Sequence, residues 1–365
     1  MKKPITILGG GHGAHQMSVD LTLRGFDIIL CEHPSFAQSF KSTLEKGEIE
    51  STGLLEGKAK IYKVTTDFKE ALKDVDLIYL VVPAIAHETF FDQVIPLLKD
   101  GQTIVIWAGD GGALRLAKRL KAEAPSKNVV IAETNTLPYG TRLVGPSKVD
   151  LFVKAKRMFM SAFPAKETKK ALDLVKPTFP VMDAIDNILS VSFSNPNPTV
   201  HPAPTLMNIG RIQYSKGDFY LYREGITEAT SRVIRKVYDE TLAVSKKFGF
   251  KMREFEDEDF RNPCSIMCVD FWAPFDKGGI VANMKGPSQI YNRYITEDLP
   301  YGLVHRSQLG KLVGVNTPVI DSIIHMGSVV CETDFWKGRT LEDLGLSGMT
   351  KEQIMRYVQE GFAKK

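Results

Sequence analysis

The first half of the chain alternates short apolar runs with segments of helical periodicity. Runs rich in β-branched and other large apolar residues occupy residues 4–8, 26–32, 76–82, 103–107 and 128–132. Apolar residues recur at helical spacing between the first two runs, and this segment ends at Gly25, a residue type typical of helix C-termini. Continuous apolar strands joined by helices indicate a parallel sheet covered on both faces. The pattern therefore predicts an α/β domain.

A glycine-rich turn joins the first predicted strand to the first predicted helix. The sequence GGGHGA places Gly9, Gly11 and Ala14 at the positions of the Gly-x-Gly-x-x-Gly dinucleotide fingerprint. Gly9 permits a tight turn, Gly11 lets the backbone approach a pyrophosphate, and the small Ala14 allows close packing of helix on strand. The helix N-terminus, which includes His12 and Gly13, would present its N–H groups to the phosphates. We therefore expect a Rossmann-type domain, the alternative being a glycine-rich turn without function.

An acidic residue stands where this fold binds the ribose. Glu32 ends the second predicted strand, about twenty residues beyond the turn, where a carboxylate binds the ribose hydroxyls and repels a 2′-phosphate. NAD is thus favoured as cofactor and NADP is less favoured. Ligands of such sheets bind beyond the carboxyl ends of the strands, so we expect the loops 83–87, 108–112 and 133–140 to line the site. Pro83 is expected beside the cofactor and Tyr139 beside the substrate.

The second half of the chain changes to helical periodicity. After about residue 185 the β-rich runs fade. Thr227 can cap a helix that ends at Gly249, and Thr317–Pro318 can begin another. We therefore predict an NAD-binding Rossmann domain over residues 1–186 and a mostly α-helical substrate and catalytic domain over residues 187–365. The active site of such a pair is expected in the cleft between the domains.

A stretch rich in proline and asparagine holds a single histidine. The sequence NPNPTVHPAPTLMNIGRI at residues 195–212 contains His201 among four prolines and three asparagines. Proline fixes φ and removes a backbone donor, so we predict a rigid, irregular lead-in rather than a helix interior. His201 is then either a general acid–base or a histidine bound to a backbone carbonyl where a helix begins. The asparagines, including Asn208, either bind polar groups of a substrate or satisfy the irregular backbone.

A second polar segment carries two candidate partners for this histidine. The sequence NRYITEDLPYGLV at residues 292–304 places Arg293 and Asp298 five apart before a Pro-Tyr-Gly turn. Arginine offers a planar, permanently charged fork to a carboxylate. Aspartate can hold a histidine in one tautomer and stabilise its cation. The simpler interpretations are a surface ion pair between Arg293 and Glu297 and a turn-forming Asp298.

Composition narrows the classes of partner. The 365 residues are 43% hydrophobic and 25% charged, which is enough chain for two domains with their own cores. The net charge of +4 is small and the basic residues are interleaved with acidic ones, so no nucleic-acid partner is expected. No run approaches the roughly 20 apolar residues of a membrane span, and glycines interrupt the apolar N-terminus. We therefore expect a cytoplasmic protein that acts on small molecules, with a homodimer as the default assembly.

The cysteines and histidines do not form a metal-binding pattern. Cys31, Cys264, Cys268 and Cys331 include no Cys-x-x-Cys pair, and we expect them to be reduced thiols. The seven histidines include no His-Glu-x-x-His or His-x-His sequence. The sequence therefore predicts no metal site.

The segments described above, taken together, resemble the octopine/nopaline (opine) dehydrogenase family along nearly the whole chain. The shared segments are, in order, GGGHGAH, AGDGGALR, AETNTLPYGTR, HPAPTLMNIGRI, REGIT and RYITEDLPYG. The glycine motif occurs in many families, whereas the histidine segment followed by Arg-x-x-x-x-Asp-x-Pro-Tyr-Gly is much more specific. The resemblance implies that His201 is the catalytic histidine, that Asp298 is its partner and that Arg293 binds substrate.

The resemblance also implies a reaction. Enzymes of that family condense the amine of an L-amino acid with a 2-oxo acid, usually pyruvate, and reduce the resulting imine with NADH to an opine. Two other functions stay open: a hydroxyacid dehydrogenase or ketopantoate-reductase-like enzyme, and a non-catalytic NAD sensor. The first commonly uses a lysine as its acid, and the second would not need His201, Arg293 and Asp298 together.

Overall fold

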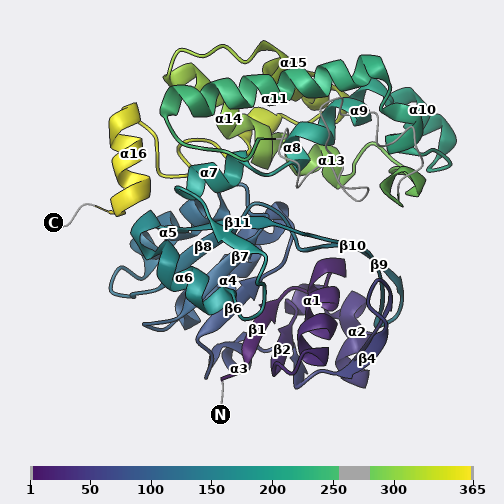
Figure 1. The fold of residues 1–365 in the computed structure, drawn as a ribbon, viewed down its shortest axis with the longest axis vertical. Helices are drawn as coiled ribbons and strands as arrows, with labels where there is room; N and C mark the ends of the chain where they lie inside the picture. The colour runs from purple at the N-terminus through teal and green to yellow at the C-terminus, as the bar shows by residue number, and fades with distance from the viewer. Residues whose placement is uncertain (1–2, 255–279, 363–365) are drawn as a thin grey trace. The chain divides into compact units, whose positions relative to one another are not determined.

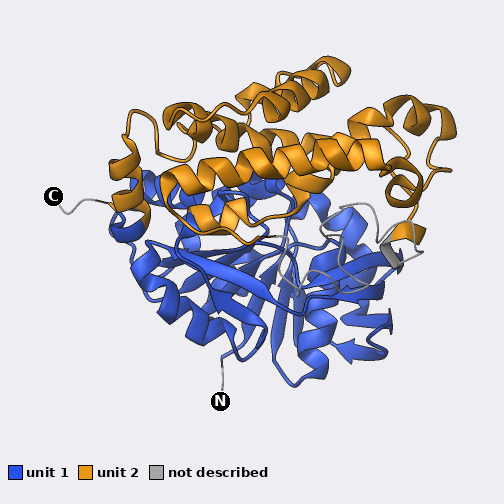
Figure 2. Ribbon diagram, turned by 45° about the horizontal axis from the view of Figure 1, so that its top comes forward, with its two compact units in different colours: residues 1–188, 359–361 blue, residues 189–358, 362–365 orange. Residues whose placement is uncertain are grey.

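The computed structural model describes residues 3–254 and 280–362, and the chain divides into two compact units. Unit 1 comprises residues 1–188 and 359–361, and unit 2 comprises residues 189–358 and 362–365 (Figure 2). None of the helices in the described ranges is both long enough and apolar enough to cross a membrane.

Unit 1 is built on an eight-stranded sheet in the order β12-β11-β8-β7-β6-β1-β2-β5 (Figure 1). Its strands are β1 (Ile5–Leu8), β2 (Ile28–Cys31), β5 (Lys63–Thr65), β6 (Leu77–Leu80), β7 (Thr103–Trp107), β8 (Val130–Thr134), β11 (Met158–Phe163) and β12 (Met182–Ala184). The run β5-β2-β1-β6-β7-β8 is the strand order of a dinucleotide-binding fold, with its switch point between β1 and β6. The five predicted strands and the α/β class are confirmed.

The sheet differs from the prediction in the direction of two strands, because β11 and β12 run opposite to the other six. All its pairings are parallel except that β11 runs antiparallel to β8. A parallel neighbour would need a crossover connection, whereas β11 follows from the excursion of β9 and β10 and enters from the opposite end. The sheet is therefore mixed rather than wholly parallel.

Helices pack against this sheet and bury it on both faces. They are α1 (His12–Leu23), α2 (Ala37–Lys46), α3 (Phe68–Leu72), α4 (His87–Leu97), α5 (Gly112–Glu123) and α6 (Thr168–Val175). Every residue of β1, β2, β6, β7 and β8 is buried, which explains why these strands have continuous apolar sequences. Edge-to-face aromatic contacts among Tyr79, Trp107 and Phe179 fill part of the core, with ring centroids 5.3 Å and 4.7 Å from that of Trp107.

A second, four-stranded sheet in unit 1 was not predicted. Its order is β4-β3-β10-β9, with β3 (Glu48–Gly53), β4 (Gly57–Lys60), β9 (Tyr139–Gly145) and β10 (Lys148–Lys154). Buried residues alternate with partly exposed ones along β3, and β4 buries only Ala59. These strands therefore lack the continuous apolar runs by which the other strands were recognised.

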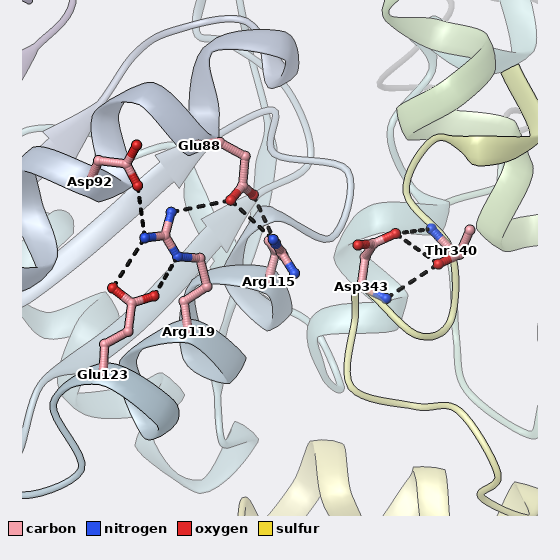
Figure 3. Close-up of polar contacts among 7 residues, drawn as sticks. All are labelled: Glu88, Asp92, Arg115, Arg119, Glu123, Thr340 and Asp343. Carbon is pink, nitrogen blue, oxygen red and sulfur yellow. Dashed lines mark hydrogen bonds and ion pairs between the residues drawn. The ribbon is translucent and has the colours of Figure 1, made fainter. Parts of the chain in front are cut away.

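Ion pairs join α4 to α5 on the exterior of unit 1 (Figure 3). The Arg119 guanidinium lies 3.1 Å from Glu88, 2.8 Å from Asp92 and 2.7 Å from Glu123, and Arg115 lies 2.8 Å from Glu88. The acidic partners are 42–62% exposed, and exposed pairs of this kind contribute about 0–1 kcal/mol each. We interpret the cluster as a surface link between two helices.

The described residues of unit 2 form helices joined by loops and turns, without a strand. Its helices are α7 (Ile188–Phe193), α8 (Asn197–Val200), α9 (Pro202–Met207), α10 (Ile209–Ser215), α11 (Glu228–Phe248), α13 (Arg293–Thr296), α14 (Val304–Leu312), α15 (Pro318–Val330) and α16 (Lys351–Glu360). The first residue of α7 and the last two of α16 are assigned to unit 1. Two π-helical segments lie at Leu221–Gly225 and Asp298–Leu303. The predicted helices from Thr227 and Thr317 are confirmed. The Thr227 hydroxyl accepts a hydrogen bond from the Thr230 N–H, and Gly249 ends the helix with φ +89°.

The described residues also contain short 3₁₀ turns. They lie at Pro34–Phe36, Ala84–Ala86, Ala165–Glu167, Ile280–Asn283 and Phe335–Lys337. In unit 2, the Asp343 carboxylate accepts from the N–H and the hydroxyl of Thr340 at 3.0 Å and 2.7 Å, which closes the turn drawn in Figure 3.

Candidate active site

The proline-rich stretch of unit 2 folds as consecutive short helices, so the predicted irregular lead-in is wrong. Pro198 lies in the first turn of α8, and Pro202 is the first residue of α9. Proline costs little in a first helical turn, because N–H groups there have no intrahelical acceptor. His201 links the two helices with helical backbone angles, φ −84° and ψ −47°, and its carbonyl accepts from the Thr205 hydroxyl at 2.7 Å. The imidazole is thus carried on a rigid backbone.

The segment that carries Asp298 is held by close contacts with glycines. A Cβ atom on Gly302 would lie 2.2 Å from Cγ of Pro198, and one on Gly338 would lie 2.4 Å from the Pro300 carbonyl oxygen. These approaches are possible only because glycine has no side chain. The Gly302 contact brings the Asp298–Leu303 segment directly against α8, and so brings Asp298 toward His201.

His201 and Asp298, 97 residues apart in sequence, form a buried pair. Nδ1 of His201 lies 2.8 Å from Oδ2 of Asp298, and both side chains are about 5% exposed or less. Burial raises the pKa of Asp298 to about 7, while the positive charges of Arg293 and Arg306 oppose this shift. A pair whose carboxyl titrates near neutral pH is suited to proton transfer at that pH.

Arg293 lies beside this pair on α13. Its side chain is 54% exposed, and its Nε lies 3.9 Å from a carboxylate oxygen of Glu297, too far for a hydrogen bond. The ion pair between Arg293 and Glu297 that the sequence suggested is therefore present, but without a hydrogen bond between these two atoms. The guanidinium combines exposure with an electrostatic effect on Asp298, so it can meet a ligand carboxylate near the His201–Asp298 pair.

Two residues near the pair were missed by sequence reasoning. Tyr294 stacks its ring on the His201 imidazole, with centroids 4.1 Å apart. Arg306 is fully buried and donates to the carbonyls of Ser192 and Asn195 at 2.7 Å and 3.2 Å. Arg306 thereby fixes the chain just before the proline-rich helices. Neither residue was recognised from the sequence, because a tyrosine or an arginine on a helix more often packs against the core or faces solvent.

Asn208 and Tyr139, both predicted to bind substrate, use their donor groups within the protein. The Asn208 amide donates to the carbonyls of Pro204 and Gly225 at 2.8 Å and 3.1 Å, so it satisfies backbone where α9 ends. The Tyr139 hydroxyl donates to the buried Asp20 at 2.6 Å within the core of unit 1. Neither residue is therefore given a part in the proposed function.

The glycine turn of unit 1 has the geometry expected of a pyrophosphate cradle. Gly9 has φ +116°, and a Cβ atom there would lie 2.6 Å from the Val81 carbonyl oxygen, at the β1–β6 switch point. A Cβ atom on Gly11, in contrast, would have no neighbour within 4 Å. Gly11 is the N-cap residue of α1, and His12 and Gly13 are the first two residues of the helix. Ala14, the next residue, is fully buried. The open backbone at a helix N-terminus fits a dinucleotide phosphate.

Glu32 lies against this turn. Its Oε1 accepts from the His33 N–H at 2.6 Å, and its Oε2 is 2.6 Å from the position of a Cβ atom on Gly10. Burial raises the pKa of Glu32 above its usual value, and backbone N–H groups of His33 and Gly10 oppose the shift. The sheet therefore brings together the phosphate turn and a carboxylate suited to ribose hydroxyls. Pro83 is exposed and precedes the 3₁₀ turn that follows β6, at the same edge of the sheet.

The loop after β7 is held in an unusual backbone conformation. Ala108, Asp110 and Gly111 have φ of 54°, 46° and 83°. The buried Glu133 carboxylate accepts from the N–H groups of Gly111 and Ala113 at 2.9 Å and 2.8 Å, and so caps α5. Non-glycine residues with such angles cluster at functional sites. Sequence reasoning expected this loop in the lining but did not single out Glu133, which lies one residue before the end of the buried strand β8.

Two of the four cysteines lie in the part of the chain that the structure describes. Cys31 and Cys331 are buried free cysteines. Cys264 and Cys268 lie outside the described residues.

Comparison with known proteins identifies the family. The family model for the α-helical domain of NAD/NADP octopine/nopaline dehydrogenases matches residues 184–331. An opine dehydrogenase from Arthrobacter sp. (strain 1C) is 34% identical over 98% of this chain and 99% of its own length. The chain belongs to the opine dehydrogenase family. It is accordingly an NAD(P)-dependent oxidoreductase of the class that acts on CH–NH donors.

Solved structures of opine dehydrogenases share the fold. An octopine dehydrogenase in complex with NADH and L-arginine has a TM-score of 0.72 at 20% identity, covering 96% of this chain and 97% of its own. A yersinopine dehydrogenase with bound NADP+ has a TM-score of 0.72 at 15% identity, covering 99% and 98%. The resemblance inferred from sequence, the Rossmann-like domain and the helical domain are thus confirmed.

Proposed function

We propose that this opine dehydrogenase joins the amine of an L-amino acid to a 2-oxo acid, pyruvate in the first instance, and reduces the resulting imine with NADH. The observation that carries the proposal is the buried hydrogen bond of 2.8 Å between His201 and Asp298, with the half-exposed Arg293 beside it. This arrangement offers one proton carrier and one carboxylate clamp, which are the two functions that the condensation requires.

His201 acts as the general acid and base in this proposal. Asp298 accepts the Nδ1 proton and fixes the tautomer, so Nε2 is the nitrogen that exchanges a proton with the substrate. The neutral amine adds to the oxo carbon, and one amine proton passes to the former oxo oxygen to give a carbinolamine. Protonated His201 then gives its proton to that hydroxyl, which leaves as water. The products of these steps are the protonated imine, water and neutral His201. A positioned acid–base of this kind contributes about 10²- to 10⁴-fold to the rate.

Arg293 binds the carboxylate of the 2-oxo acid. A guanidinium forms two parallel hydrogen bonds with a carboxylate and so fixes the oxo carbon as well as the charge. Its weak contact with Glu297 at 3.9 Å can be replaced by such a ligand at little cost. The positive charge also disfavours substrates that lack an anionic group near the oxo carbon.

Unit 1 binds the cofactor in this proposal. Backbone N–H groups at Gly11, His12 and Gly13 receive the pyrophosphate, and Glu32 receives the ribose hydroxyls. The bound nicotinamide supplies the hydride that reduces the imine carbon. NADH is favoured because the Glu32 carboxylate would repel a 2′-phosphate, although one of the structural relatives binds NADP+.

The function is tested by following NADH absorbance with pyruvate, with and without a pool of L-amino acids, and with NADPH in parallel. The proposal predicts oxidation that requires both pyruvate and an amino acid, and a loss of about 100-fold or more in His201→Ala. Oxidation with the oxo acid alone would identify a hydroxyacid dehydrogenase. NADH binding without turnover on any oxo acid would favour a sensor. We also propose a cytoplasmic location, which suits two buried free thiols, and a homodimer.

A further inference from the structure

The His201 imidazole is contacted on its face as well as at its edge. The Tyr294 ring lies nearly parallel to it, with centroids 4.1 Å apart and an interplanar angle of 28°. The Tyr222 ring approaches nearly perpendicular, with centroids 6.5 Å apart. The Tyr222 hydroxyl donates to the Tyr294 hydroxyl at 3.4 Å. The histidine therefore contacts aromatic rings from two separate segments of unit 2.

A hydrogen bond alone does not fix an imidazole ring. The bond to Asp298 holds Nδ1 at 2.8 Å, but the ring plane could still pivot about that contact. A second ring in stacking contact blocks the pivot and so fixes the direction of Nε2. The face of a phenol ring is also electron-rich, so it attracts an imidazolium more strongly than a neutral imidazole.

Tyr294 is itself held in place. The Asn292 side chain caps α13 and accepts from the Tyr294 N–H at 3.0 Å. The hydroxyl of the buried Tyr222 donates a hydrogen bond to the Tyr294 hydroxyl. Burial is the main cause that raises the pKa of Tyr222 well above its usual value, and the neighbouring Tyr294 raises it further. The Tyr222 hydroxyl thus remains a donor across the working pH range. Both ends of the stacked tyrosine are therefore anchored.

We propose that Tyr294 is a positioning residue for His201, which fixes the plane of the imidazole and stabilises its protonated form by stacking. The proposal rests on the acid–base role of His201 proposed above. The charged groups near the imidazole come from several elements. Asp298 accepts its hydrogen bond, and the positive charges of Arg293 on α13 and Arg306 on α14 act on Asp298. By the sign of their charges, Asp298 favours an imidazolium and the two arginines oppose it. Tyr294 adds to the effect of Asp298 without adding a charge.

The test separates the ring of Tyr294 from its hydroxyl. In the full-length protein, the His201 resonance is followed by NMR through a pH titration and assigned by its loss in His201→Gln. Tyr294→Leu removes the aromatic face and should lower the titration midpoint of His201 by roughly 0.5 to 1 pH unit. Tyr294→Phe keeps the face and should leave the midpoint unchanged. Tyr214→Leu, at a tyrosine that is 86% exposed, is the matched control and should also have no effect.

Turnover provides the second measurement. If protonated His201 is the general acid, activity falls as pH rises through the titration midpoint of His201. In Tyr294→Leu the alkaline limb of the kcat/KM profile should therefore move to lower pH by as much as that midpoint does. Coincident titrations of Tyr294→Leu and wild type would overturn the proposal, as would equal shifts in the Leu and Phe variants. If Tyr294→Leu does not fold, Tyr294→Met carries the same prediction. Retained activity in His201→Ala would remove the proposed function instead, since the titration is measured without substrate.

Discussion

The contact between Gly302 and Pro198 predicts that adding one methyl group at position 302 would move His201 and Asp298 apart. In Gly302→Ala the new Cβ would lie 2.2 Å from Cγ of Pro198, whereas carbon atoms in contact prefer about 3.5–4.0 Å. The two segments must therefore move apart by more than about 1 Å. The proline ring cannot swing away as a flexible side chain would, so the backbone of α8 or of Asp298–Leu303 has to shift.

The shift acts directly on the pair, because His201 lies three residues after Pro198 and Asp298 four residues before Gly302. Adding about 1 Å to the present 2.8 Å separation takes the pair beyond hydrogen-bonding distance. A misplacement of this size can cost about 100-fold in rate, and overpacking of this kind costs about 1–3 kcal/mol of stability. We expect kcat/KM to fall about 100-fold, with a moderate decrease in the free energy of unfolding measured in urea.

A matched variant in the same region provides the control. Gly210 lies in α10, nine residues after His201, and a Cβ atom there would have no neighbour within 4 Å. Gly210→Ala should therefore keep full activity and gain up to about 1 kcal/mol from the higher helix propensity of alanine. If Gly302→Ala is destabilised but keeps activity within a few-fold of wild type, the idea that this contact positions the pair is refuted.

Three further variants test the rest of the site. Burial raises the pKa of Asp298 from 3.8 to about 7, so its contribution to stability is complete below about pH 4 and is lost as pH rises through 7. Asp298→Asn should abolish this part of the decline, and parallel stability–pH curves for the two proteins would contradict it. Arg293→Lys should reduce kcat/KM for pyruvate by about 10- to 100-fold while NADH binding, measured by fluorescence titration, stays unchanged. Gly11→Val should weaken NADH binding by about tenfold or more, because its side chain would stand where the backbone approaches the pyrophosphate. The melting temperature should change little, because a Cβ atom at this position has no neighbour within 4 Å.

The sequence predicted those parts of the fold in which one physical signal dominates. Continuous apolar runs marked the strands buried on both faces, and Thr227 with Gly249 marked both ends of α11. The second sheet escaped because β4, with the sequence GKAK, buries one side chain and carries two lysines. The proline-rich helices escaped because their prolines fell at the N-cap or in the first turn, where the usual penalty for proline in a helix does not apply.

The site was predictable in its residues more than in its geometry. His201, Asp298 and Arg293 were found by motif and by resemblance, and the structure brings the first two within 2.8 Å. Tyr294 and Arg306 were not found, since their roles depend on contacts between segments that lie about 90 to 115 residues apart and no local pattern encodes them. Tyr139 was assigned to substrate because its loop was expected at the site, whereas its hydroxyl is taken by Asp20 in the core.

The most direct test of the proposed reductive condensation is the product itself. Pyruvate and a pool of L-amino acids would be incubated with NADH that carries deuterium at the transferable position, and the products analysed by mass spectrometry. We predict a secondary amine whose mass equals that of one amino acid plus pyruvate minus water, plus one hydrogen and one deuterium, and its absence with His201→Ala. Deuterated lactate formed without incorporation of any amino acid would contradict the account.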